Sequence, residues 1–377
     1  MTTKKELLRS TKTRVLRVLV IVLGMALVVG AAYFVLPAVL SVSYDGAAQV
    51  GTTTGQVATK PTIPPLNTLE YDKRLLALAQ VATSSPWYQA FIDHTVASTT
   101  IPRPLWPVRQ PYPTDSRALL PFNRIVAYYG NFYSKQMGAL GEYDKDTVLA
   151  KLKAEAAEWE AADPTTPVVL AIEYIDVTAQ GSAGKDGKYR LRMPDTQVDK
   201  ALEYAKEING IVILDIQVGL SSVQDEVPLL DTYWAMPNVH LALDPEFDMP
   251  GNTPPGRVIG TTDATTINWA INHLSDIVKA NNLPPKILLL HRFTQNMITN
   301  YDQIQPTPQV QVIVQMDGWG SPQRKKNTYY HVVAPEPVQF TGVKLFYKND
   351  LKEDPPRLLT KQEVLDLKPS PSFIQYQ

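Results

Sequence analysis

VHLALDPE, residues 239–246, is a strand-like hydrophobic run that ends in two carboxylates one residue apart. Asp244, Pro245 and Glu246 stand where the hydrophobic strand should stop. Side chains two positions apart on a strand point to the same side, so both acids share one face if the strand continues to Glu246. In parallel α/β folds, ligands meet the carboxyl ends of the strands. This segment therefore predicts a strand that delivers two acids to a site.

Seven other runs have the character of a short strand, and helical patterns alternate with them. The strand-like runs are residues 124–130, 168–176, 211–217, 286–292, 310–317, 328–334 and 342–348. The helical patterns are residues 146–161, 194–208, 222–234 and 262–280, and Thr360-Lys361-Gln362-Glu363 has the form of a capping box. Strands alternating with helices predict a parallel sheet, and eight strands predict a closed (β/α)8 TIM-like barrel. Weak helices after the fifth to seventh strands predict an irregular barrel, with an open doubly wound sheet as the alternative.

Composition narrows the class of protein. A chain of 377 residues with 44% hydrophobic and 19% charged residues can bury one large core. It has no Cys, which excludes a disulfide framework. The net charge is −1, and because residues 1–17 carry +5, the remainder carries −6. This balance gives no electrostatic reason to expect nucleic-acid binding.

The N-terminal region has the pattern of a membrane anchor. Residues 18–36 are uncharged and mostly apolar, and at about 1.5 Å per residue they can cross a hydrocarbon core of about 30 Å. Basic residues dominate positions 1–17, which favours a cytoplasmic N-terminus. We expect one transmembrane helix in residues 18–40 of a single-pass cell-membrane protein, with the C-terminal domain extracytoplasmic. A cleaved signal peptide is the alternative, because Val29-Gly30-Ala31 resembles a cleavage site.

Between this anchor and the barrel, two segments differ in composition. Residues 41–68 are rich in Thr, Gly, Ala and Pro, which is typical of a flexible stalk. Residues 69–121 combine two short helical patterns with a Pro-rich stretch that lacks several backbone donors. We interpret residues 69–121 as a strap on the main domain and residues 122–377 as the barrel domain.

Polar side chains gather at the carboxyl ends of five predicted strands. In chain order they are Glu173; Asp215 and Gln217; Asp244 and Glu246; His291 and Arg292; and Gln315 and Asp317. The pairs on the third, fourth and sixth strands are each two residues apart, so each pair shares one face of its strand. A single acid at a strand end could instead cap the next helix. The repetition on neighbouring strands favours one shared polar site.

Aromatic residues flank the same strand ends. Tyr129 ends the first strand, Tyr347 ends the predicted eighth, and Trp319 lies in a loop between two glycines. Flat apolar rings beside carboxylates suit the C–H faces of sugar rings, while packing of loops onto the barrel is the alternative. Trp319 is the strongest candidate for a sugar contact.

At Asp244-Pro245-Glu246 the chain resembles barrel-fold glycoside hydrolases, particularly the chitinase-like and lysozyme-like groups in which Asp-x-Glu ends the fourth strand. The resemblance implies that Glu246 is the general acid/base and that Asp244 assists it. The chitinase-like signature has further alternating acids upstream, which residues 239–243 lack. The chain is also similar to uncharacterised bacterial exported proteins around Tyr128-Tyr129-Gly130-Asn131 and Leu243-Asp244-Pro245-Glu246.

Glycoside cleavage needs one carboxyl group that stays protonated and a second group that stabilises positive charge. Glu246, Asp244, Asp215 and Asp317 are therefore the predicted catalytic residues. The predicted substrate-binding residues are Glu173, Gln217, His291, Arg292, Gln315, Trp319, Tyr129 and Tyr347. The expected partners are cell-envelope or extracellular carbohydrate and, through residues 18–40, the lipid bilayer.

Two other functions remain open at this point. The acids and His291 include ligands suited to a divalent cation. No His-x-His or His-Glu-x-x-His occurs, however, so we predict neither a metal nor a cofactor. A glycan-binding or scaffold barrel without turnover is the second alternative, because a fold does not imply an activity.

Overall fold

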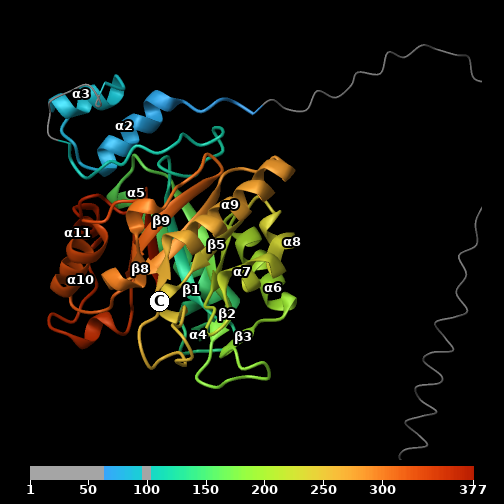
Figure 1. Cartoon of the computed structure of the whole chain (residues 1–377). Helices are drawn as coiled ribbons and strands as arrows, with labels where there is room; N and C mark the ends of the chain where they lie inside the picture. The colour runs from blue at the N-terminus through green and yellow to red at the C-terminus, as the bar shows by residue number, and fades with distance from the viewer. Residues whose placement is uncertain (1–62, 96–102) are drawn as a thin grey trace, which may run out of the picture. The chain divides into compact units, whose positions relative to one another are not determined.

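The computed structural model describes residues 63–95 and 103–377, which contain an eight-stranded parallel barrel (Figure 1). Its strands, in order around the barrel, are β1 (Arg124–Gly130), β2 (Val168–Ala179), β4 (Ile211–Ile216), β5 (Val239–Leu243), β7 (Lys286–Arg292), β9 (Val310–Met316), β10 (Phe340–Leu345) and β11 (Phe373–Tyr376). β1 pairs in parallel with both β2 and β11, which closes the barrel. The predicted (β/α)8 TIM-like fold is confirmed, and the open sheet is excluded.

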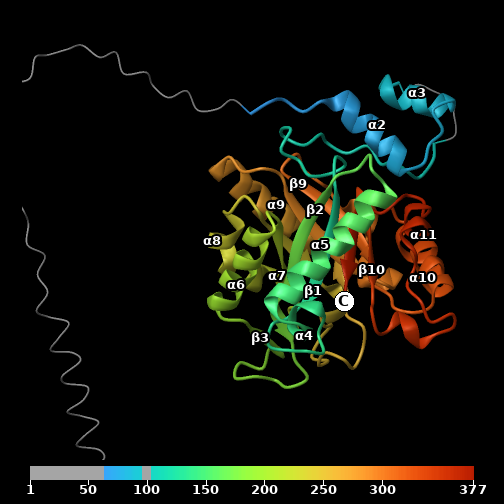
Figure 2. The same cartoon turned by 180° about the vertical axis from the view of Figure 1, so that it is seen from behind.

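Helices cover the outside of the barrel unevenly (Figure 2). The long ones are α5 (Lys145–Ala162), α6 (Asp195–Glu207) and α9 (Ala264–Asn281). The short ones are α4 (Ala139–Glu142), α7 (Val223–Glu226), α8 (Asp231–Trp234), α10 (Pro322–Thr328) and α11 (Lys361–Leu365). β7 is followed by isolated 3-10 turns in place of a helix, which agrees with the predicted irregularity. The capping box at the start of α11 is present, with the Thr360 side chain accepting from the Glu363 amide at 3.1 Å.

One predicted barrel strand was wrong, and one strand of the barrel was missed. Residues 328–334, predicted as a strand, belong to α10 and the π-helical turn Tyr329–Val333. Tyr329, Val332 and Val333 are buried there, which is the three-and-four spacing of a helix. The β-branched and aromatic composition of this run therefore did not decide its structure. The eighth strand is instead β11, a run of only four residues.

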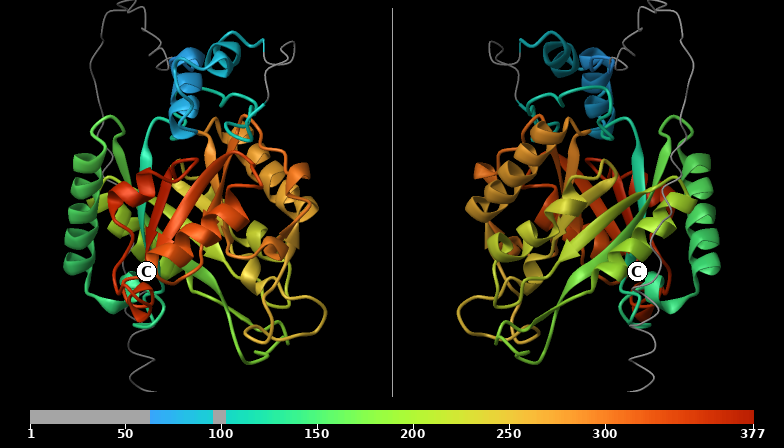
Figure 3. Two further views of the ribbon diagram at one scale, coloured as in Figure 1. Left: turned by 90° about the vertical axis from the view of Figure 1, so that its left-hand side faces the viewer. Right: turned by 90° about the vertical axis from the view of Figure 1, so that its right-hand side faces the viewer.

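The interior of the barrel near the amino ends of its strands is apolar and is closed by two helices. α2 (Thr68–Leu78) and α3 (Pro86–Ile92) bring Tyr71, Leu76 and Phe91 into one buried cluster with inward side chains from the early part of the strands. Both helices lie at the end of the barrel opposite α4 and β3 (Arg190–Arg192), as Figure 3 shows. Side chains fill this end of the barrel, so a ligand can enter only from the end formed by the carboxyl ends of the strands.

Further along the strands the inward side chains become polar. Tyr129, Glu173, Asp215, His291, Gln315, Lys344 and Gln375 continue the inward alternation beyond the apolar cluster. Their outward neighbours on the same strands, such as Tyr128, Tyr174 and Leu290, pack in the cluster beneath the surrounding helices. The barrel therefore carries a polar layer at the carboxyl ends of its strands.

The N-terminal predictions concern residues that mostly lie outside the described part of the chain. The predicted tail (1–17), the anchor (18–40) and residues 41–62 of the stalk fall there. Within residues 63–95 and 103–377, no helix has the length and apolar character needed to span a bilayer. The described part of the predicted strap contacts the barrel: the Trp106 indole donates to the Ala334 carbonyl, and the Gln110 side chain donates to the Val338 carbonyl, both at 2.8 Å.

Candidate active site

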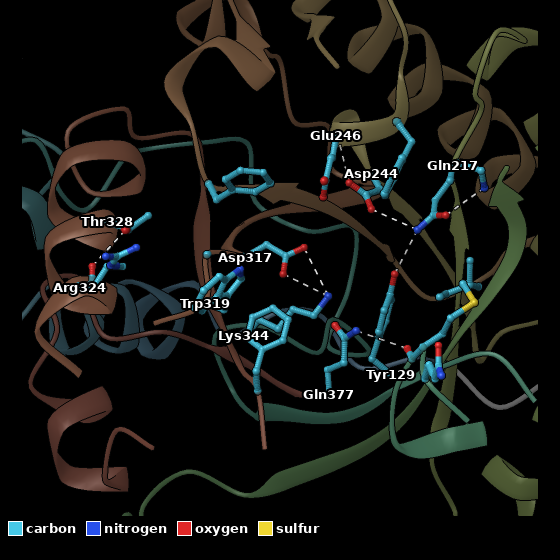
Figure 4. A pocket seen from close by; sticks show the side chains of 18 residues that line it. Tyr129, Gln217, Asp244, Glu246, Asp317, Trp319, Arg324, Thr328, Lys344 and Gln377 are labelled. Carbon is cyan, nitrogen blue, oxygen red and sulfur yellow. Dashed lines mark hydrogen bonds and ion pairs between the residues drawn. The ribbon is translucent and has the colours of Figure 1, made fainter. Parts of the chain in front are cut away.

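A pocket of about 570 Å³ opens at the carboxyl ends of the strands (Figure 4). Six of the predicted site residues line it: Tyr129, Gln217, Asp244, Glu246, Asp317 and Trp319. Four others, Glu173, Asp215, His291 and Gln315, lie fully buried in the polar layer of the barrel. Asp244, Glu246 and Asp317 therefore meet in one concave site, supported by a second set of buried polar groups.

The Asp244-Pro245-Glu246 segment reaches the pocket through a turn. β5 ends at Leu243, and residues Pro245–Phe247 form a 3-10 turn whose first amide is capped by Asp244: the Glu246 amide donates to Asp244 Oδ1 at 3.1 Å. The other carboxylate oxygen, Oδ2, accepts from Gln217 Nε2 at 3.2 Å. The strand does not continue to Glu246, so strand alternation is not what brings both acids to the site.

His291 lies at the centre of the polar layer, between acidic groups. Its Nδ1 is 2.9 Å from Asp317 Oδ2, its Nε2 is 3.1 Å from Glu173 Oε1, and the same Nε2 is 4.0 Å from Asp215 Oδ1. Burial alone would lower the pKa of His291, but the hydrogen bonds to Asp317 and Glu173 raise it well above its usual range. A carboxylate oxygen beside each ring nitrogen favours the doubly protonated imidazolium form, in which both nitrogens donate.

A hydrogen-bonded chain connects this imidazolium region to Asp244. The Tyr129 hydroxyl donates to Asp215 Oδ2 at 2.9 Å and accepts from Gln217 Nε2 at 3.3 Å. Gln217 also donates to Asp244, so Asp215 and Asp244 are linked through two side chains. Asp244, which lines the pocket, therefore accepts hydrogen bonds from neutral groups, the Gln217 side chain and the Glu246 amide.

Side-chain amides of the polar layer supply a hydrogen-bond donor to Glu173. Gln375 Nε2 donates to Glu173 Oε2, and Gln315 Nε2 donates to Gln375 Oε1 at 3.0 Å. Gln375 lies on β11, the strand that the sequence patterns missed, so this contact could not be anticipated. Glu173 consequently has a cation on one oxygen and an amide donor on the other.

Lys344 is a pocket residue that the sequence patterns did not single out. It is an inward side chain of β10, and its Nζ is 3.1 Å from Asp317 Oδ1 and 3.8 Å from the centre of the Tyr129 ring. A lysine within the hydrophobic run of residues 342–347 was the available signal, because the alternation of that strand turns it inward. Asp317 thus has a cation on each side, Lys344 and His291.

These contacts separate the acids into two kinds. Burial alone would raise the pKa of Asp317, but the charges of Lys344 and His291 lower it below its usual range. Burial and the nearby charge of Asp317 raise the pKa of Glu246. Burial also raises the pKa of Asp244 well above its usual range and that of Asp215 to about 6. Within the pocket, the surroundings therefore lower the pKa of Asp317 and raise the pKa values of Glu246 and Asp244.

Five predicted substrate-binding residues do not line the pocket. Glu173, His291 and Gln315 lie buried in the polar layer, whereas Arg292 and Tyr347 lie outside both the pocket and that layer. Arg292 follows the inward His291 on β7 and so points outward, where its guanidinium donates to the carbonyls of Thr294 and Ile298. The Tyr347 hydroxyl donates to Glu155 on α5 at 2.7 Å, and its ring stacks on Tyr376 on the outer side of the barrel. Both side chains hold surrounding loops and helices in place.

Two of the acids, Asp317 in the pocket and Glu173 in the polar layer, have cationic side chains of the protein beside them. Within the part of the chain that the structure describes, no group of three or more His, Asp or Glu side chains is arranged to hold a metal ion. The imidazolium of His291 and the ammonium of Lys344 occupy positions beside Asp317 and Glu173 where a cation would bind. The donor set is suited to proton chemistry.

The chain has only low similarity to known proteins. No family model matches the chain, and no curated protein matches it. Among solved structures it is similar to the mannanase man26 of Bacillus subtilis, with 12% identity over 71% of this chain and 88% of that chain and a TM-score of 0.37. A putative alpha-L-fucosidase from Bacteroides thetaiotaomicron VPI-5482 has 12% identity over 74% of this chain and 91% of its own, with a TM-score of 0.35. A ruminal GH26 endo-beta-1,4-mannanase has 10% identity over 67% and 58%, with a TM-score of 0.33. This likeness concerns no more than the fold.

Proposed function

We propose that the protein is a glycoside hydrolase that acts on cell-envelope or extracellular carbohydrate. The observation that carries the proposal is that two carboxyl groups in different surroundings line one pocket beside the partly exposed Trp319: Asp317 lies between Lys344 and His291, and Glu246 has no cationic partner among the described residues. Most glycoside hydrolases use two carboxyl groups whose environments move their pKa values apart. An aromatic face beside such acids suits a sugar ring.

In this mechanism Glu246 protonates the oxygen of the leaving sugar as the glycosidic C–O bond breaks. A water molecule then forms the new C–O bond at the sugar carbon, and the proton that this water loses returns to Glu246. Its carboxyl group has no hydrogen bond or ion pair to any described residue, so it is free to turn toward a substrate. Asp317 stabilises the positive charge that develops on the sugar ring, and Lys344 and His291 hold Asp317 in its ionised form. Asp244 holds the turn that carries Glu246.

The membrane location is part of the same proposal. We place the apolar residues 18–40 in the cell membrane and the barrel outside the cytoplasm, on the strength of the basic residues that precede the apolar run. A membrane protein of this kind is released from washed membranes by detergent and not by high salt. Release by salt alone would contradict the anchor.

The activity is tested with the full-length chain in detergent, incubated with peptidoglycan and with a panel of polysaccharides. Release of new reducing ends, followed by mass spectrometry of the products, is the expected result. Saturable binding of a glycan without any release would instead favour the non-catalytic glycan-binding barrel. Absence of both binding and release would overturn the proposal.

Replacing Lys344 with Met is expected to move the acid limb of the pH–activity profile to higher pH. Lys344 lowers the pKa of Asp317, so its loss raises that pKa. Asp317 acts as the ionised form, and activity is lost as pH falls through its pKa, so the variant loses activity at a higher pH than the wild type. The measurement is kcat/KM as a function of pH.

The matched control for this prediction is Lys348→Met. Lys348 is exposed and pairs with Glu142 at the surface, at 2.7 Å. Its replacement removes the same charge without touching Asp317, and the acid limb should stay in place. An unchanged profile in the Lys344 variant would exclude Lys344 from control of Asp317.

A further inference from the structure

A buried ion pair lies directly behind the loop that carries Trp319. Lys325 on α10 and Asp350 both have fully buried side chains, with Nζ 3.1 Å from Asp350 Oδ2. Neither residue lines the pocket, and the proposed reaction makes no use of either of them. Burying two charges is costly unless their remaining hydrogen-bonding groups are satisfied, so their partners indicate what the pair does.

Those partners are the backbone groups on the two sides of Trp319. Lys325 Nζ donates to the Gly318 carbonyl at 2.8 Å, and the Gly320 amide donates to Asp350 Oδ1 at 2.9 Å. One member of the pair thus holds the residue before the tryptophan, and the other member holds the residue after it. The loop is bracketed by a single buried pair.

The loop needs such restraint because glycine flanks Trp319 on both sides. Glycine loses more conformational freedom on ordering than any other residue. Gly320 has a φ of 143°, in the region that favours glycine, and a Cβ there would lie 2.5 Å from the Arg324 side chain. Trp319 as a residue is 45% exposed, so the rest of the protein covers only part of it.

Asp350 also accepts a hydrogen bond from the residue that follows β10. The amide of Phe346, which follows β10, donates to Asp350 Oδ2 at 3.0 Å. Phe346 lines the pocket, and Lys325 Nζ is 5.0 Å from the centre of its ring. The Trp319 loop is therefore tied to the end of the strand that carries Lys344.

We propose that the Lys325–Asp350 ion pair is a positioning device that holds the Trp319 loop in the conformation in which the indole ring receives a glycan. This inference rests on the proposed function for the identity of the ligand, whereas the ordering of the loop follows from the bonds to Gly318 and Gly320. A ring that is ordered before binding costs less entropy when a sugar stacks on it. Lys325 and Asp350 act through Trp319 without touching the sugar.

The first experiment is amide hydrogen exchange of the full-length protein, with Lys325→Met and Asp350→Asn as variants. Both are expected to accelerate exchange at Gly320, whose amide donates to Asp350 in the wild type. Lys326→Met is the matched control, because Lys326 is the next residue on α10 and pairs with Glu363 at the surface. Exchange at Gly320 that stays as slow as in the wild type, in variants with native circular dichroism, would overturn the proposal.

The second experiment is a double-mutant cycle between Lys325→Met and Trp319→Ala. The probes are soluble hexasaccharides of glucose, mannose and N-acetylglucosamine, with binding followed by calorimetry. Each single variant is expected to lose roughly tenfold in affinity, and the double variant should lose no more than Trp319→Ala alone. Losses that add in the double variant would overturn the proposal, because the pair would then act independently of Trp319.

The two experiments separate this inference from the proposed function. If the wild type binds none of the probes, the glycan proposal is contradicted for these sugars, while exchange at Gly320 still decides whether the pair orders the loop. If binding is present and exchange is unaffected by the variants, the glycan proposal stands and the positioning role fails.

Discussion

Replacing Glu246 with Gln is expected to lower kcat for glycoside hydrolysis about 10²–10⁴-fold, the usual contribution of a general acid. The amide has nearly the shape of the carboxyl group but cannot donate a proton to a leaving oxygen. The Glu246 side chain has no hydrogen bond to any described residue, so its replacement breaks no recorded contact. Initial rates on the substrate found in the glycan screen measure the effect.

The pH dependence gives a second readout for Glu246. Burial and Asp317 raise the pKa of Glu246, and a proton donor loses activity as pH rises through its pKa. The alkaline limb of the wild-type profile should therefore be missing from the residual activity of the Glu246→Gln variant. Because the folded state binds more protons than the unfolded state at a raised pKa, stability falls as pH rises, and the neutral amide should not lower the melting temperature.

The control for Glu246→Gln is Glu160→Gln. Glu160 is exposed on α5, outside the pocket, and the chemical change is identical. Its variant should keep the wild-type rate. Hydrolysis that survives Glu246→Gln at full rate would remove Glu246 from the role of acid, even if the glycan remains the substrate.

Replacing His291 with Leu is expected to reduce the free energy of unfolding by about 3–5 kcal/mol, the usual cost of removing one partner of a buried charge pair. The variant leaves Glu173 and Asp317 in the barrel interior without the imidazolium that both contact. Leucine fills part of the volume but supplies no donor to either acid. Urea denaturation at neutral pH measures the loss.

The sign of the pH dependence distinguishes this role from simple packing. The folded-state pKa of His291 is raised, so its stabilising contribution is complete below its unfolded pKa and is lost as pH rises through the folded pKa. The His291→Leu variant should lack that dependence. His331→Leu, at an exposed position on the surface, should change stability by no more than about 0.5 kcal/mol. A His291 variant as stable as the wild type would contradict the buried imidazolium.

The strand ends that carry acids were largely predictable. The alternation along residues 211–217 and 310–317 put Asp215 with Gln217, and Gln315 with Asp317, on one face of each strand, because side-chain direction on a strand alternates with position. The structure turns that face toward the barrel interior. Adjacent residues on a strand point to opposite faces, so Arg292 points outward because His291 points inward. Predicting both residues for one site was therefore wrong. Tyr347 was misplaced because an aromatic residue after a strand can pack outward as well as inward.

Other features depended on packing between distant segments. Residues 328–334 have strand-like composition, yet they form a helical turn because Tyr329, Val332 and Val333 bury one helical face. Lys344 was not predicted as a site residue because its partner, Asp317, lies on a different strand. β11 is only four residues long, so its pattern is too short to identify.

The sequence by itself determined that acids would gather at the carboxyl ends of parallel strands, because the period of two along each strand is a local property. Only the tertiary structure decided which acid is ionised and which holds its proton. Barrel closure brings Lys344 and His291 to Asp317, while Glu246 stays beside a negative charge. Electrostatic effects on a pKa depend on distance and burial, which are set when separate strands pack together.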